Sequence, residues 1–521
     1  MLSPHRRRNE SNVWVDEVST EIKNLISMAN ELDIVPWENT AIPSDKVYYT
    51  PDSEIFSVMV EQLLAVFVVR VIALINENNS EEKCESMIKA SDLSELRQFI
   101  KTILEHYNAV DYHSSEHALH VTLNSSKFIA FLMKPDESTT RISYGIQSSA
   151  MMQFAFIFAA LIHDVQHLGV TNYALTEEEH ELAILYSDQS MLEQQSLTVA
   201  FREFLKPCYS NLRTLLFSPD YSANYNKFRR LAVDLVLCTD TASPERMQLT
   251  RSKFLAAFGE DNDKHLSVST RPSFVDTHKK EDLADDDSWE SGQLSSKDKE
   301  VEKKDKQSQR RSKEESKDIN INNVTNISVA TNGDLRSSPH KLGIRIALDF
   351  TGLTASRETK VRFEEEREKE NDTEAKREFN DNLNQEDPLK AQVILELMIR
   401  AADVGATSQS FENFTKWGRR LYFEQKTAFE AGRGEDPDHI WLTIQIIFLE
   451  NYAKKLTKSI EDSRVFGQDY NFFVSNVEAN KRKWKELGAS VTASIRADWE
   501  AEKLRRNSEM IQCSSSRFIG K

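Results

Sequence analysis

Phe154–Gly169, FAFIFAALIHDVQHLG, changes character at a single position. Its first nine residues are all apolar, which is typical of a helix buried in a protein core. The run then ends in His163-Asp164, where burial of an unpaired carboxylate would be costly. A bound metal ion removes that cost. The stretch therefore indicates a buried helix with a metal site at its end.

Histidines are concentrated in the same part of the chain. Half of the 12 histidines lie between His106 and His167. His113 and His117 are four residues apart, as are His163 and His167, so each pair shares one face of a helix. Imidazole and carboxylate groups bind zinc, and oxygen ligands suit magnesium or manganese. The alternative is a chance pair of core histidines, each satisfied by a hydrogen bond.

A second apolar run ends in the same way. Residues 394–399, ILELMI, lead through Arg400-Ala401-Ala402 to Asp403. The repeated placement of a carboxylate at the end of an apolar helix favours the metal site over chance pairs of histidines.

Helical patterning is found on both sides of the middle of the chain. Apolar residues between Ile55 and Phe67 recur at helical spacing, and the pattern resumes from Ala391 to about Trp499. Alternating strand patterns are nearly absent, and only 14 glycines and 12 prolines occur. The sequence predicts an all-α fold, with its helices in one compact domain.

The composition changes at about Gly259. Between that residue and Ser338 the only aromatic residues are Phe274 and Trp289, and charged and small polar residues dominate. Such a segment cannot bury enough apolar surface to offset its ordering entropy. We therefore predict a partly helical N-terminal segment at 1–50, a folded domain in two parts at 51–258 and 341–505, a disordered charged insert at 259–340, and a flexible tail at 506–521. The helix expected at about 13–32 is either a dimer contact or a lid on the core.

Charge and cysteine content restrict the partners and the compartment. The chain has 83 acidic and 66 basic residues, a net charge of −17, which argues against nucleic acid as a partner. Its four cysteines are far apart and form no C-x-x-C pair, which favours a reducing, cytoplasmic location. The apolar stretch Ile55–Ile75 contains Glu61, Gln62 and Arg70, so we expect a core helix and no integral membrane segment.

Six motifs in order resemble those of class I 3′,5′-cyclic nucleotide phosphodiesterases. The resemblance covers roughly Ser53–Phe258 and Leu389–Trp499 and rests on Tyr112-His113-x-x-x-His117-Ala118, His163-Asp164-x-x-His167-x-Gly169-x-x-Asn172, Tyr186-Ser187-Asp188-Gln189-Ser190-Met191-Leu192-Glu193, Cys238-Thr239-Asp240, Ala402-Asp403-Val404 and Gln445-x-x-Phe448. It implies an HD-type phosphodiesterase catalytic domain that hydrolyses the 3′ phosphoester bond of cyclic AMP or cyclic GMP to the nucleoside 5′-monophosphate.

The resemblance also implies a site with two divalent metal ions. Zinc would occupy a tight site, and magnesium or manganese a second site that shares Asp164. The implied ligands of the tight site are His117, His163, Asp164 and Asp403. His113 would protonate the leaving oxygen, a task that suits an imidazole because its pKa lies near neutral pH. The implied supporting residues around the metals are His167, Glu193 and Thr239.

The other part of the implied site is a purine pocket. Gln445 would hydrogen-bond the purine edge, since an amide offers a donor and acceptors. Phe448 would stack on the ring, with Leu421 as the apolar side chain opposite it, and Tyr112 would line the pocket near the metals. Without the resemblance, Leu421 and Phe448 read as ordinary core residues.

The chain departs from the family motifs at several positions. His120 stands where the family has Asp, which alters the surroundings of the metals or adds a ligand. Ala406 stands where many members have Asn, close to the purine, and tilts the expectation toward cyclic GMP or dual use. The family motif has a glycine directly before the phenylalanine that Phe448 matches, whereas this chain has Ile447. The preference between the two nucleotides stays open.

Two other functions are compatible with these residues. An HD-type phosphohydrolase acting on another nucleotide shares the His and Asp ligands but has no need of Gln445, Phe448 or a proton donor at His113. An inactive nucleotide-binding scaffold would use the insert for partner contacts. A homodimer is also compatible with the sequence.

Overall fold

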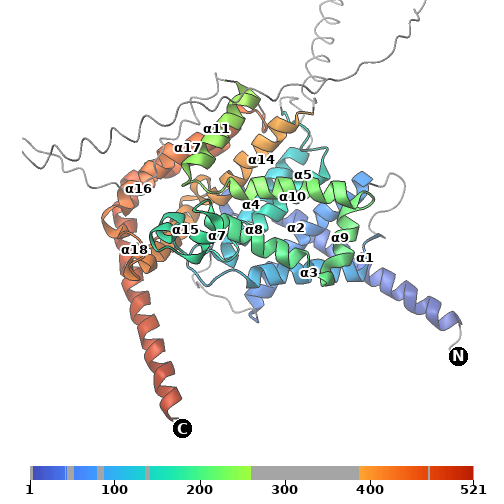
Figure 1. The fold of residues 1–521 in the computed structure, drawn as a ribbon, viewed down its shortest axis with the longest axis horizontal. Coiled ribbons are helices and arrows are strands. Elements are labelled where there is room, and N and C mark those ends of the chain that lie inside the picture. The colour runs from blue at the N-terminus through green and yellow to red at the C-terminus, as the bar shows by residue number, and fades with distance from the viewer. Residues whose placement is uncertain are drawn as a thin grey trace, which may run out of the picture. The chain divides into compact units, whose positions relative to one another are not determined.

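The structure, a computed structural model, describes residues 4–41, 43, 52–78, 87–134, 141–259, 386–467 and 470–519. Helices and connecting turns make up these ranges, and no β-strand occurs among them (Figure 1). The prediction of an all-α fold is confirmed. Apart from Gly259, the insert predicted at 259–340 lies outside the described residues.

The helices before the undescribed segment 260–385 form the first part of the fold. In chain order they are α1 (Pro4–Ile34), η1 (Trp37–Asn39), α2 (Glu54–Asn78), α3 (Ala90–Glu105), α4 (Ser115–Met133), α5 (Ala150–Ile162), α6 (Asn172–Glu177), α7 (Glu181–Tyr186), α8 (Met191–Phe204), η3 (Pro207–Tyr209), α9 (Ser210–Phe217), α10 (Tyr221–Leu237) and α11 (Pro244–Phe258).

The helices after that segment form the second part. They are α14 (Pro388–Asp403), η5 (Gly405–Ser408), α15 (Phe411–Glu430), η6 (Pro437–His439), α16 (Trp441–Phe448), the π-helical turn η7 (Leu449–Ala453), α17 (Lys454–Asp462) and α18 (Phe472–Ile519). Helix α18 continues to Ile519, and the flexibility predicted for the tail from 506 stays a prediction. Helix-forming residues with an ion pair of Glu502 to Arg506 at i, i+4 account for the continuation.

Helix α5 is the centre of the core. Ser149 caps its first turn by accepting a hydrogen bond from the backbone N–H of Met152, and the residues from Phe154 to Ile162 are almost completely buried. Helices α2, α4 and α10 pack around it, as Figure 1 shows for the middle of the molecule. A helix that is apolar on all sides needs such a complete cover.

Helix α2 is long and apolar enough to cross a membrane by length and composition. Residues Glu54–Glu77 have a hydropathy of 2.4, and 67 % of this apolar stretch is buried inside the protein. Arg70, within it, is buried and donates to Gln153 Oε1 on α5 at 2.8 Å. Core helices pass the same test of length and hydropathy, and the buried Arg70 pair fits a core helix.

The N-terminal segment covers the core rather than standing apart from it. Ile22, Leu25 and Ala29 of α1 are buried in the main apolar cluster. The ring of Trp37 of η1 contacts that of Phe128 in a tilted arrangement, with centroids 5.0 Å apart, and its indole N–H donates to the carbonyl of Ser408 at 3.1 Å. The sequence left this helix as either a dimer contact or a lid on the core, and its buried residues favour the lid.

Helix α14 brings the second part of the chain against the first. It packs on α4, α5, α10 and α11, and its last residue is Asp403. The same packing places its C-terminal end next to the N-terminal turns of α4 and the end of α5. Three segments far apart in sequence therefore meet at one place.

Candidate metal centre and active site

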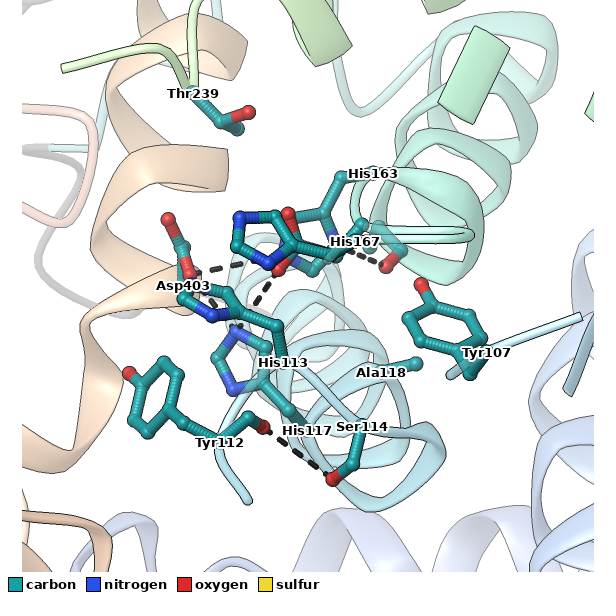
Figure 2. Close-up of polar contacts among 12 residues, drawn as sticks. Tyr107, Tyr112, His113, Ser114, His117, Ala118, His163, His167, Thr239 and Asp403 are labelled. Atoms are coloured by element: carbon teal, nitrogen blue, oxygen red, sulfur yellow. Dashed lines mark hydrogen bonds and ion pairs between the residues drawn. The ribbon is translucent and has the colours of Figure 1, made fainter. Parts of the chain in front are cut away.

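The four predicted metal ligands converge at the junction of α4, α5 and α14. One ligand atom from each of His117, His163, Asp164 and Asp403 lies within 4.8 Å of the others. His117 Nε2 is 3.0 Å from Asp403 Oδ1, and His163 Nε2 is 3.0 Å from Asp164 Oδ2. Figure 2 shows His117, His163 and Asp403 pointing toward one another. Both imidazoles are buried.

The hydrogen bonds of His163 fit a cation at this place. His163 Nδ1 lies 2.9 Å from the carbonyl oxygen of Ala160, to which it can only donate. In the neutral ring Nε2 then carries a lone pair, and this atom has no hydrogen-bond partner among the described residues. A lone pair that faces two carboxylates is unfavourable without a positive charge between them. Two imidazole nitrogens and two carboxylate oxygens form a donor set that suits zinc.

Charge interactions within this group shift its pKa values. Burial opposes ionisation of Asp403, but the neighbouring imidazoles of His117 and His163 outweigh it and hold the pKa of Asp403 below its ordinary value. Burial also opposes ionisation of Asp164, whose pKa the imidazoles of His163 and His113 nevertheless depress. Both carboxyl groups are therefore anionic at neutral pH, which is the form that binds a cation.

His113 lies beside the metal ligands and is held by a carboxylate. Its Nδ1 atom is 2.5 Å from Glu424 Oε1, and Glu424 Oε2 accepts the backbone N–H groups of Tyr112 and His113 at 2.8 and 3.0 Å. Burial lowers the pKa of His113, but the carboxylates of Glu424 and Asp164 outweigh burial and raise that pKa to about 9. The imidazole is thus protonated at neutral pH.

Glu424 was missed by the sequence analysis. It lies on α15, on an amphipathic helix where a carboxylate usually faces solvent, yet it is 5 % exposed. Its own pKa falls to about 2, because the charge of His113 outweighs burial. No local pattern around Glu424 distinguishes it from Glu412 or Glu430 on the same helix. Only the packing of α15 against the Tyr112–His113 loop identifies it.

His167 stacks directly on His113. Their ring centroids are 3.7 Å apart at 26°, and Figure 2 shows the two rings close together. Burial and the charge of His113 lower the pKa of His167 to about 4, so this ring is neutral. His113, His167 and Glu424 also form a group with ligand atoms within 4.8 Å. The short contact between His113 and Glu424 favours an ion pair there.

The other predicted supporting residues lie at the edge of the site. Glu193 accepts from Asn172 Nδ2 at 3.0 Å, and burial and the charge of Asp240 raise its pKa to about 8. Thr239 donates its hydroxyl to the carbonyl of Val236 at 2.7 Å. Figure 2 shows Thr239 apart from the histidine group. Its predicted support of the metals stays a prediction.

Three residues predicted to bind the purine, Leu421, Gln445 and Phe448, lie on α15 and α16. Gln445 is 8 % exposed, and its amide makes no hydrogen bond with the described residues. Phe448 stacks on Tyr452 with ring centroids 5.1 Å apart. Leu421 packs in a cluster with Trp441, whereas Phe448 packs against the main core. The opposition of Leu421 and Phe448 across a ligand stays a prediction.

Tyr112 lies against the metal ligands. Its ring centroid is 4.6 Å from that of His117 and 5.6 Å from that of Trp417. The ring therefore forms one wall of the site, between the predicted ligands and α15.

His120 is not a member of the ligand group. Its ring lies 6.3 Å from that of His117, and its Nε2 atom is 3.0 Å from Gln409 Oε1. Burial and the neighbouring His117 lower the pKa of His120 to about 3, so the imidazole is neutral. The sequence left open two consequences of having His120 in place of the family's Asp. These contacts fit altered surroundings of the metals better than an added metal ligand.

An all-helical domain with a buried His/Asp group where α4, α5 and α14 meet defines a candidate metal-dependent protein of the HD type. A model of the family described as 3′5′-cyclic nucleotide phosphodiesterase matches residues 112–328. The matched segment contains the predicted site residues from Tyr112 to Thr239 and ends before Asp403, Leu421, Gln445 and Phe448. Residues 112–328 of the chain are therefore similar to the 3′5′-cyclic nucleotide phosphodiesterase family.

Named relatives match part of the chain. The probable 3′,5′-cyclic-AMP phosphodiesterase pde-4 of Caenorhabditis elegans is 34 % identical over 152 residues, which cover 28 % of this chain and 20 % of the relative. The cGMP-specific 3′,5′-cyclic phosphodiesterase alpha of Plasmodium falciparum is 31 % identical over 119 residues, 23 % of this chain and 11 % of the relative. The matches thus span about a fifth or less of these relatives' lengths.

A solved structure aligns over more of the chain. The phosphodiesterase domain of Salpingoeca rosetta rhodopsin phosphodiesterase covers 91 % of this chain and 97 % of its own, at 16 % identity and a TM-score of 0.48.

Proposed function

We propose that this protein hydrolyses the 3′ phosphoester bond of cyclic AMP, cyclic GMP or both to the nucleoside 5′-monophosphate. One observation carries the proposal above all. A group of two imidazoles and two carboxylates that suits a metal lies directly beside a protonated imidazole, His113. A phosphodiester needs both a stabiliser of developing negative charge and a proton for its leaving oxygen.

We propose that His117, His163, Asp164 and Asp403 hold a zinc ion and that Asp164 also serves a second ion, magnesium or manganese. When bound, such a pair of ions polarises phosphate oxygens and lowers the pKa of water. The chain's own contribution is a set of anionic carboxylates with depressed pKa values, whose charge is compensated when cations are present. The Ala160 carbonyl fixes the orientation of His163 through its Nδ1 hydrogen.

His113 is proposed as the group that protonates O3′ as the phosphorus–oxygen bond breaks. Glu424 fixes Nδ1, which leaves Nε2–H as the proton to be donated. The stacked ring of His167 limits rotation of the imidazole. A pKa of about 9 ensures that the acid form predominates at neutral pH.

Gln445 is proposed to bind the purine edge, with Phe448 and Leu421 on the faces of the ring. The support is that Gln445 is buried yet makes no hydrogen bond through its amide to the described residues. A purine edge supplies both a donor and an acceptor, which match the amide of Gln445. An adenine and a guanine can each pair with an amide that is free to rotate.

A substrate panel tests the proposal. Purified protein would be assayed with cyclic AMP, cyclic GMP, a nucleoside triphosphate and a nonspecific phosphodiester, with added zinc and magnesium and after chelation. We expect turnover of at least one cyclic nucleotide and its loss on chelation. Turnover of the triphosphate alone would instead support a different HD-type phosphohydrolase. Bound metal without any turnover would support a nucleotide-binding scaffold.

We further propose that the protein acts in the cytoplasm. The support is the acidic composition and the two described cysteines, Cys208 and Cys238, which are both free thiols. The possible homodimer stays a prediction, and the buried α1 residues Ile22, Leu25 and Ala29 do not favour α1 as the contact. Light scattering on the purified chain measures the oligomeric state directly.

A further inference from the structure

A fully buried polar network lies behind the candidate metal ligands. His120 Nε2 is 3.0 Å from Gln409 Oε1, and Gln409 Nε2 donates to Asn124 Oδ1 at 2.9 Å. Asn124 Nδ2 donates to the carbonyl of Ala402 at 2.9 Å, and Asn413 Nδ2 donates to Gln409 Oε1 at 2.5 Å. None of the four side chains belongs to a residue more than 2 % exposed. Such buried networks fix geometry when their donors and acceptors match.

The pattern of donors and acceptors favours a donor at His120. Gln409 Oε1 is an acceptor because Asn413 donates to it, so the 3.0 Å contact of His120 Nε2 with the same oxygen is a hydrogen bond when Nε2 carries the hydrogen. Asn124 Nδ2 passes 3.1 Å from His120 Nε2 but donates to Ala402. The His120 ring stacks on Trp417 with centroids 4.8 Å apart at 25°, which prevents it from turning.

The network joins the two helices that supply metal ligands. His117, His120 and Asn124 lie on one face of α4, at spacings of three and four residues. Ala402, which accepts from Asn124, directly precedes Asp403 on α14. The turn η5, which follows α14, approaches α4 closely, because a Cβ atom added at Gly405 would clash with Asn124 Nδ2.

We infer that His120, Asn124, Gln409 and Asn413 form a positioning network that sets the distance between the candidate ligands His117 and Asp403. This inference rests on the proposed metal centre, and it assigns to His120 a role that depends on an imidazole donor. His120 acts through the network and not by contact with metal or substrate. The aspartate that the family motif has at this position would face Gln409 Oε1 with a second acceptor.

The consequence is a chain-specific requirement at position 120. A carboxylate there would be buried, would meet the carbonyl oxygen of Gln409, and would lose the stacking on Trp417. Removing this repulsion would require the Gln409 amide to rotate, and the rotated amide would lose its hydrogen bonds with Asn413 and Asn124. A shift of Asn124 would then move Ala402, to which Asn124 donates, and with it the adjacent Asp403.

The test measures zinc affinity directly, without a nucleotide. Full-length wild type, His120→Asp, His120→Gln and Gln409→Met would be freed of metal and titrated with Zn²⁺ alone against a chromogenic chelator. Ser125→Ala is the matched control, since Ser125 is a buried residue of α4 whose hydroxyl has no hydrogen-bond partner among the described residues. Urea midpoints and far-ultraviolet circular dichroism would be recorded for every variant.

We expect His120→Asp and Gln409→Met to bind Zn²⁺ roughly 10–100-fold more weakly than wild type, the range found when groups behind metal ligands are removed. His120→Gln keeps a donor N–H and should stay within a few-fold, as should Ser125→Ala. Unchanged zinc affinity in both His120→Asp and Gln409→Met overturns the inference. So does an equal loss in His120→Gln. If His120→Asp does not fold, Gln409→Met decides alone.

The proposed function can fail separately. Zinc bound tightly by wild type, with no hydrolysis of either cyclic nucleotide, would contradict the proposed reaction but leave the positioning role supported by the variant series. A wild type that does not bind Zn²⁺ overturns the positioning role.

Discussion

The Nδ1 atom of His113 lies 2.5 Å from the Oε1 atom of Glu424, a residue 311 positions later in the chain. The contact ties the loop before α4 to the middle of α15. It raises the pKa of the imidazole to about 9 against the effect of burial and lowers the pKa of the carboxyl to about 2. The pair is therefore ionised across the neutral range.

The first prediction concerns pH and Glu424. His113 acts as an acid only when protonated, and because its pKa in the folded protein is raised, kcat should fall as pH rises through about 9. In Glu424→Gln the carboxylate that raises this pKa most is absent, so the basic limb of the kcat profile should move to lower pH. The measurement is kcat from pH 6 to 10 for both proteins, with Glu412→Gln on the exposed face of α15 as control. A basic limb at the same pH in both would contradict the pairing.

The second prediction concerns His113 itself. His113→Ala removes the proposed proton donor but none of the four predicted ligands, so we expect kcat to fall roughly 10²–10⁴-fold with bound zinc unchanged. Metal content by mass spectrometry and steady-state kinetics on cyclic AMP and cyclic GMP check this. A His113→Ala protein with full kcat would show that another group protonates O3′.

The third prediction concerns Asp403. Asp403→Ala removes one of the four converging ligand atoms, so we expect zinc content and turnover to be lost together. Asp387→Ala, at the other end of α14, is the matched control, because Asp387 caps the helix through the N–H of Lys390 and pairs with the side chain of the same residue, far along the helix from Asp403. That change should cost about 1 kcal/mol of stability and leave zinc content unchanged. Retention of stoichiometric zinc by Asp403→Ala would remove this residue from the site.

The fourth prediction concerns Gln445. Truncation in Gln445→Ala removes an amide that has no partner among the described residues, so folding should be unaffected. If the amide binds the purine edge, KM for the cyclic nucleotides should rise about 10-fold or more while kcat changes less. Gln392→Ala on α14 is the control, because it removes an amide that bonds Asp234 of α10 and Glu396 of α14 and is not proposed to bind the purine. Equal KM values for wild type and Gln445→Ala would place the base elsewhere.

The helical class and the residues His163, Asp164 and Asp403 leave local signals in the sequence, whereas His117 was predicted as a ligand from the resemblance to the family motif. An apolar run that ends in His163-Asp164, and another that ends in Ala402-Asp403, are visible without knowledge of packing. Polar side chains buried at the ends of such helices need hydrogen-bond or charge partners, and the other buried polar residues of the group can supply them. The convergence of distant segments then follows from the chemistry of these few residues.

Glu424 and Gln409 leave no such signal. Glu424 lies on an amphipathic helix among other glutamates, and Gln409 follows a short turn of small and polar residues. Each becomes significant only through a contact with a residue about 300 positions away. Their roles depend on how α15 and η5 pack against α4, which a single sequence does not specify. Charged helix formers likewise occur both in flexible tails and in exposed helices such as α18.

The last turns of α18 that can be described reach the loop that carries His113. Arg506 Nη2 lies 3.0 Å from Asp111 Oδ1, two residues before His113. The carboxyl side chain is 3 % exposed and that of Arg506 27 %. Burial raises the pKa of Asp111, and Arg506 opposes this effect more than any other group. The C-terminal helix is therefore coupled to the candidate active-site loop by a nearly buried ion pair.

The fifth prediction follows from this ion pair. Arg506→Gln leaves the buried carboxylate of Asp111 without its main counter-charge, so we expect a loss of about 1–3 kcal/mol in the free energy of unfolding, less than for a fully buried pair because Arg506 is partly exposed. The double variant Asp111→Asn/Arg506→Gln removes the stranded charge and should recover most of that loss. Urea unfolding of the wild type, both single variants and the double variant measures the coupling. Additive losses in the two single variants would mean that α18 and the His113 loop are energetically independent, because a real pair must give a double variant more stable than the sum predicts.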